Sequence, residues 1–142
     1  MGNDIFAKAV DRFLEDNHTG EVLAMLDAVI VRGDGARLIE EVVLKEQSSV
    51  GTQETAISRT MQRLEALAEN SPTIACSLMA YLLPLASKLR MHDICDSIFL
   101  WIGSCDSEGL TDQLESIAQA ETDADMRRHY EQLVRNRRPS RT

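Results

Sequence analysis

Residues 74–89 read IACSLMAYLLPLASKL, and this stretch decides the fold. It is apolar on nearly every side, and a helix of that kind is normally surrounded by other elements of the core. Ser71 and Pro72 precede it, a helix cap followed by proline at the first helical position. We therefore expect a central helix over residues 73–89. Pro84 lies inside it and donates no backbone hydrogen bond, which predicts a kink or an end just before that residue.

Helical periodicity continues on both sides of this central segment. Apolar residues recur every three or four positions in seven further stretches, separated by caps, glycines or polar turns. No stretch shows the sustained alternation of a strand. The approximate limits of the seven stretches are 4–17, 19–33, 38–45, 52–69, 92–103, 107–118 and 123–134. The sequence therefore predicts an all-α fold of about eight helices in antiparallel hairpins, either an α-solenoid-like stack or a compact helical bundle.

The size and composition of the chain fit one helical domain. It has 142 residues, of which 44% are hydrophobic and 27% charged, values typical of a globular protein. We assign residues 1–134 to the domain and 135–142, RNRRPSRT, to a basic disordered tail. The N-terminus lacks the pattern of a secretory signal, and the longest apolar stretch is too short and too interrupted to cross a bilayer. We expect a soluble, cytoplasmic protein that does not bind membranes.

The potential ligands and nucleophiles do not form a recognisable catalytic or metal-binding set. Cys76, Cys95 and Cys105 contain no CxxC pair, and their apolar neighbours predict reduced, buried thiols. His92, Cys95 and Asp96 share a helical spacing, but a structural zinc site needs four ligands and Cys95 belongs to an apolar stripe. GxSxG, HExxH and glycine-rich phosphate loops are absent from the sequence. We expect no metal, no cofactor and no enzymatic activity.

Negative charge is concentrated in the last third of the chain. The formal net charge is −8, and residues 91–134 contain ten acidic residues against two arginines. A surface of that sign attracts basic proteins and repels phosphate, which makes nucleic acid an unlikely partner. Phe99 and Trp101 cannot share one helix face, so either one of them is exposed as an aromatic anchor or their helix is buried on two sides. The candidate partner-binding residues are Asp93, Asp96, Trp101, Asp106, Glu108, Asp112 and Glu115.

A short segment near the C-terminus carries a family resemblance. The run Asp125-Met126-Arg127-Arg128, followed by Glu131 and Leu133, resembles the second helix of a HEAT-type repeat within residues 107–134. In size, acidity and helix content the chain is also similar to bacterial toxin-immunity proteins, some of which look like short HEAT-type stacks. This resemblance implies a non-catalytic inhibitor that neutralises a basic toxin such as a nuclease.

Two other functions remain open at the level of sequence. A secretion or assembly chaperone, or an adaptor, would hold a peptide in an apolar groove between helices. A helical regulator or enzyme would bind a small ligand in a pocket of at least about 300 Å³. We place the candidate pocket of the latter near Met79, Tyr81, Pro84 and Cys95.

Overall fold

The computed structural model describes residues 2–105 and 108–137, and all the regular structure among them is α-helical. Eight helices lie within these ranges, as the sequence predicts. Thr19 and Ser71 are N-caps, as predicted. The side-chain oxygen of each accepts a hydrogen bond from a backbone N–H in the first turn of its helix. The helices are α1 (Gly2–Leu14), α2 (Gly20–Val31), α3 (Gly35–Val50), α4 (Gln53–Ala68), α5 (Pro72–Lys88), α6 (His92–Ser104), α7 (Glu108–Ala120) and α8 (Ala124–Arg137).

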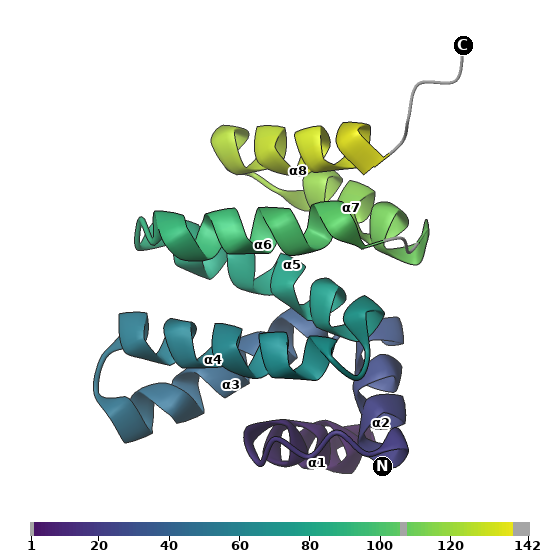
Figure 1. Cartoon of the computed structure of the whole chain (residues 1–142), viewed down its shortest axis with the longest axis vertical. Coiled ribbons are helices and arrows are strands. Elements are labelled where there is room, and N and C mark those ends of the chain that lie inside the picture. Colours follow the sequence, from purple (N-terminus) through teal and green to yellow (C-terminus); the bar gives the residue numbers. More distant parts are fainter. Residues whose placement is uncertain (1, 106–107, 138–142) are drawn as a thin grey trace.

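The helices pair into hairpins that stack along the long axis of the molecule. α3 packs against α4, α5 against α6 and α7 against α8, while α3, α5 and α7 contact one another in succession. Figure 1 shows α4, α6 and α8 one above another in one layer, with α3, α5 and α7 behind them. α1 and α8 lie at opposite ends of the long axis. Of the two predicted arrangements, the stack of hairpins describes this packing.

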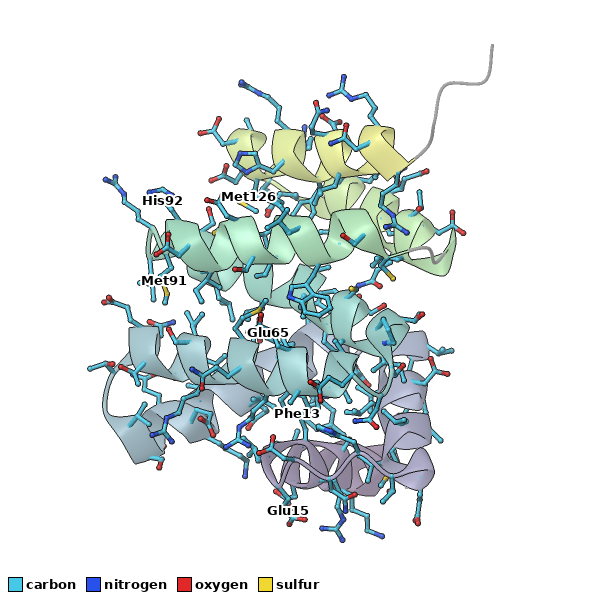
Figure 2. The ribbon with its side chains drawn as sticks, viewed as in Figure 1. Phe13, Glu15, Glu65, Met91, His92 and Met126 are labelled. Atoms are coloured by element: carbon cyan, nitrogen blue, oxygen red, sulfur yellow. The ribbon has the colours of Figure 1, made fainter. Side chains whose placement is uncertain are left out.

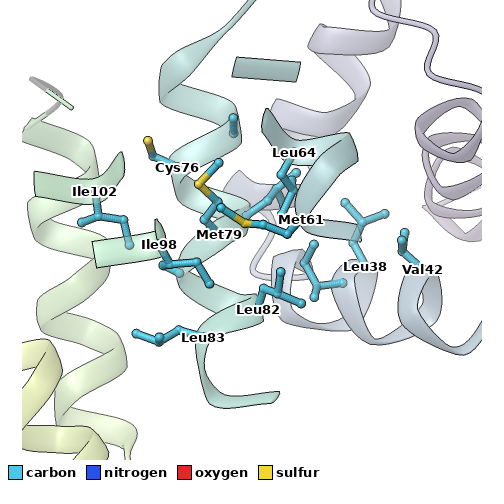
Figure 3. Close-up of a cluster of buried hydrophobic side chains, with 14 of the residues drawn as sticks. Leu38, Val42, Met61, Leu64, Cys76, Met79, Leu82, Leu83, Ile98 and Ile102 are labelled. Carbon is cyan, nitrogen blue, oxygen red and sulfur yellow. The ribbon is translucent and has the colours of Figure 1, made fainter. Parts of the chain in front are cut away.

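The central helix of the core is α5, as its all-round apolar sequence predicts. It contacts α2, α3, α4, α6 and α7, and most of its residues from Ala75 to Ala86 are buried. Figure 3 shows the resulting cluster, in which Met79 and Leu82 of α5 lie among side chains of α3, α4 and α6. Burial of large aliphatic side chains on all sides of one helix explains why few aromatic residues suffice for this core.

α5 runs to Lys88, close to the predicted limit of residue 89, so of the two predicted effects of Pro84, a kink or an end, the end does not occur. Proline has no N–H, and the carbonyl of Ala80, one turn earlier, therefore loses its usual helical donor. The hydroxyl of Tyr130 on α8 donates to that carbonyl at 3.0 Å, and both residues are fully buried. A side chain from the last helix thus satisfies a backbone group that the proline leaves without a partner.

The last helix is longer than the sequence suggests. α8 extends to Arg137, so the first three residues of the predicted disordered tail belong to a helix. The Arg137 guanidinium donates to the hydroxyl of Thr111 at 3.0 Å and to the carbonyls of Ile102 and Cys105. These carbonyls end α6, where a cation is favoured by the helix dipole. Residues 138–142 lie outside the described part of the chain.

Candidate functional site

The acidic character of the C-terminal third belongs to α6 and α7 and not to α8. Residues 91–123 contain eight acidic residues and no lysine or arginine. α8, in contrast, contains four arginines and two acidic residues. Negative charge is therefore concentrated around α6 and α7, and the last helix adds positive charge beside them.

α6 presents two of the predicted acidic residues on its outer face. Asp93 and Asp96 are both exposed, and Asp93 lies in the first turn, where a carboxylate is favoured by the helix dipole. Leu100 follows one turn after Asp96 and is 73% exposed. Residues spaced by three and four positions lie along one side of a helix. Asp93, Asp96 and Leu100 therefore form one stripe, which we call the α6 face.

Phe99 and Trp101 are both partly buried, one against each neighbouring helix of the layer. The Phe99 ring packs edge-on against His129 of α8, with 5.5 Å between ring centroids. The Trp101 indole N–H donates to a carboxylate oxygen of Glu65 on α4 at 3.2 Å. α6 is thus packed on two sides, as the second of the two interpretations of Phe99 and Trp101 predicts. Trp101 is therefore not a free aromatic anchor for a partner.

The residue between these two aromatics was missed by sequence reasoning. Ile98 and Ile102 of α6 are fully buried, and Leu100 lies halfway between them in the chain. Successive helical residues are rotated by about 100°, so Leu100 points away from the side that Ile98 and Ile102 bury. In the sequence, Leu100 lies between Phe99 and Trp101. If these two aromatic side chains pack against helices on either side of α6, the leucine between them faces solvent, and this was the available signal.

A cavity of about 490 Å³ opens beside Asp93, at the turn between α5 and α6. Its walls combine apolar side chains of the turn with exposed polar groups. Two carboxylates line it, Asp93 of α6 and Glu54 in the first turn of α4. Figure 2 labels Met91 and His92 at this end of α6. The cavity is lined by Glu54, Ser58, Leu89, Arg90, Met91, His92, Asp93 and Ile94. Such a cavity can take the aliphatic stem of a long basic side chain beside the carboxylates.

The remaining predicted residues form a second group, on α7. Asp112 is exposed, and Glu115 is partly buried and lines a cavity of about 400 Å³ between α7 and α8, together with Val134 and Arg135. Asp106 lies outside the described residues, as does the side chain of Glu108. The predicted set is therefore divided between two helices of different hairpins.

His92, Cys95 and Asp96 do not converge. Cys95 is buried in the core, whereas His92 and Asp96 are exposed. Throughout residues 2–105 and 108–137, no three His, Cys, Asp or Glu side chains gather closely enough to hold a metal ion. Burial raises the pKa of the Cys95 thiol, and the charge of Asp96 adds to this rise, so the thiol stays protonated at neutral pH.

The region proposed for a small-ligand pocket is filled by the protein itself. Met79 is fully buried, and the Ala80 carbonyl beside the proline is occupied by the Tyr130 hydroxyl. Tyr81 lies against Gly35 at the start of α3, where the ring leaves no room for a Cβ atom. These contacts favour a structural role for the middle of α5.

An ion-pair network around the buried Glu46 was also missed. Arg63 of α4 contacts Glu46 of α3 at 3.0 Å and Asp16, after α1, at 2.9 Å. Glu46 is only 6% exposed. Burial lowers the pKa of Arg63, but hydrogen bonds and charges from Asp16 and Glu46 outweigh it and raise that pKa overall. The position of Glu46, on the same side as Val42 and Val43, was the available signal.

No family model, curated protein or solved structure matches this chain. Among the described residues, no helix is both long enough and apolar enough to cross a bilayer. The chemistry of the exposed side chains is therefore the basis for a functional proposal. One exposed feature of the acidic segment is the α6 face, in which Leu100 continues a stripe of two carboxylates.

Proposed function

We propose that this protein is a non-catalytic, cytoplasmic binding protein whose α6 face docks a basic surface of a partner protein. The observation that carries this proposal is Leu100, which is 73% exposed on the same stripe as Asp93 and Asp96. Protein interfaces commonly place an apolar anchor inside a polar or charged rim. In its most specific form, the partner is a cationic toxin such as a nuclease, and this protein is its inhibitor.

The two parts of the α6 face act at different stages of binding. Asp93 and Asp96, with the other acidic residues of 91–123, attract a basic partner before contact and raise the association rate. Leu100 is buried only in the complex, and full burial of a leucine contributes about 1.5–3 kcal/mol. That free energy corresponds to roughly a 10- to 100-fold change in Kd.

Charge reversal with a matched control tests this assignment. Protein carrying Asp93→Lys and Asp96→Lys is compared, as bait in a native extract at low salt, with protein carrying Asp27→Lys and Glu40→Lys. All four positions are exposed, and the two pairs change the net charge equally. We expect a basic partner to be retained by the wild type and by the Asp27/Glu40 variant, and lost from the Asp93/Asp96 variant. Equal loss from both variants, or from neither, contradicts the proposal.

Measurements with the purified partner separate the roles of charge and anchor. We expect higher salt to slow association, because exposed charges are screened beyond about 8 Å at physiological ionic strength. Leu100→Ser should increase the dissociation rate and leave association nearly unchanged. For the inhibitor form of the proposal, an equimolar amount of this protein abolishes the enzymatic activity of the partner, and the Asp93/Asp96 variant does not.

A further inference from the structure

Two of the three cysteines lie at the C-terminal end of α6. Cys76 is fully buried on α5, and its thiol donates to the carbonyl of Trp101 at 3.5 Å. Cys105 follows α6 as its C-cap residue and is only partly buried, which corrects the expectation that all three thiols are buried. The Cys76 sulfur thus lies beside the last turn of α6, at a carbonyl four residues before Cys105 in the chain. The α5–α6 hairpin therefore brings together two thiols that are far apart in sequence.

A cation lies at the same place. The Arg137 guanidinium of α8 donates to the carbonyls of Ile102 and Cys105. Burial raises the pKa of the Cys76 thiol to about 12, Cys105 adds to this rise, and the charge of Arg137 opposes it. Burial outweighs the effect of Arg137 at Cys76, so this thiol stays protonated at neutral pH, and the partly exposed Cys105 is the sulfur that an oxidant in solution reaches first.

We propose that Cys76 and Cys105 form a reversible disulfide when the protein meets a peroxide, and that this bond fastens α5 to the end of α6. The proposal does not depend on the identity of the binding partner. It rests on the placement of two thiols, one buried and one partly exposed, at the end of α6 that the Arg137 guanidinium contacts.

The chemistry proceeds in two balanced steps. The more accessible Cys105 thiolate attacks one oxygen of hydrogen peroxide, breaks the O–O bond and becomes a sulfenic acid, while the other oxygen leaves as hydroxide. The Cys76 sulfur then attacks the Cys105 sulfur, the S–O bond breaks, and the hydroxyl leaves as water with the Cys76 proton. In total, two thiols and one peroxide give one disulfide and two waters. Two electrons pass from sulfur to oxygen, and a dithiol reductant reverses the change.

Cys95 provides an internal control for this proposal. It is buried in the first half of α6, and the charged group that perturbs its thiol is Asp96 and not another cysteine. The disulfide should therefore join Cys76 to Cys105 and leave Cys95 reduced. Cys95→Ala should form the same bond as the wild type, whereas Cys105→Ala should form none within the chain.

Mass spectrometry of the native wild-type protein is the decisive test. The folded protein is treated mildly with hydrogen peroxide, the peroxide is removed, and free thiols are then alkylated in denaturant. We expect a monomer that has lost two hydrogen atoms and carries one alkyl group, on Cys95. Digestion without reductant should yield a peptide pair that links Cys76 to Cys105. Because the bond closes a loop of about 30 residues, the oxidised protein should melt roughly 5–10 °C higher than the reduced protein.

Other products would overturn the proposal. These are a Cys105 sulfinic or sulfonic acid without a link, a dimer joined through Cys105 of two chains, or a bond that includes Cys95. Formation of the link only in urea would also contradict it, because the bond would then require the unfolded chain. Circular dichroism recorded during oxidation shows whether the protein is folded when the bond forms. The same measurement shows whether the Cys95→Ala and Cys105→Ala variants are folded.

Discussion

Replacing Tyr130 with phenylalanine removes one hydroxyl from the core and nothing else. That hydroxyl donates to the carbonyl of Ala80 at 3.0 Å, and the carbonyl has lost its helical donor because residue 84 is proline. Both groups are fully buried, so water does not replace the lost hydrogen bond. Burial also raises the pKa of the Tyr130 hydroxyl, which keeps it protonated as a donor.

The expected loss follows from the penalty of an unsatisfied buried carbonyl. Such a group costs about 1–3 kcal/mol. For a domain of this size, each kcal/mol corresponds to about 3 °C in Tm, so Tyr130→Phe should lower Tm by about 3–9 °C. The ring itself stays, and no cavity is formed.

A double-mutant cycle with Pro84→Ala isolates this cause from all others. Alanine at position 84 supplies the missing N–H, so the Ala80 carbonyl keeps one donor after the hydroxyl is removed. We expect Tyr130→Phe to cost at least about 1 kcal/mol less in the Pro84→Ala background, measured by urea unfolding. An equal cost in both backgrounds would refute the reasoning, because the tyrosine would then act independently of the proline.

Three further predictions concern polar groups of the core. Arg63→Met should lower the free energy of unfolding in urea by about 3–5 kcal/mol, because it leaves Glu46 buried and charged without its partner. Asp16→Asn should lower it by at most about 1 kcal/mol, because Asp16, the other partner of Arg63, is exposed. Trp101→Phe should cost about 1–2 kcal/mol by the same measurement, because it removes the indole hydrogen bond to α4; an unchanged unfolding midpoint would contradict the contact. The folded protein keeps the proton of Cys76 to a pH of about 12, whereas the unfolded chain releases it near 9.0. The stability that this proton provides is full below the lower value and is lost as pH rises toward the higher one, by up to about 1.4 kcal/mol per pH unit. Cys76→Ala should therefore reduce the alkaline loss of Tm, and an unchanged slope would contradict the raised pKa.

Sequence patterns predicted the type and number of the secondary-structure elements of this protein, but not all of their ends. The helical period, the caps at Thr19 and Ser71 and the absence of strand alternation predicted an all-helical chain, and the all-round apolar character of residues 74–89 predicted the central helix. These signals depend on residues within about one turn of each other, so they can be read without knowledge of the fold. The accessible acidic stripe of Asp93 and Asp96 follows from the same period.

Contacts between helices were decided only by the tertiary structure. Periodicity shows which side of α6 is apolar, but it does not show that α4 and α8 cover its two flanks and leave Leu100 exposed. Likewise, Pro84 alone predicts a kink or an end of the helix, but α5 continues, and the freed carbonyl of Ala80 accepts a hydrogen bond from Tyr130, fifty positions after Ala80 in the chain. The physical reason is the same in both cases. A backbone or side-chain group is satisfied by whatever the stacking of hairpins places beside it, and the order of residues along one helix does not specify that neighbour.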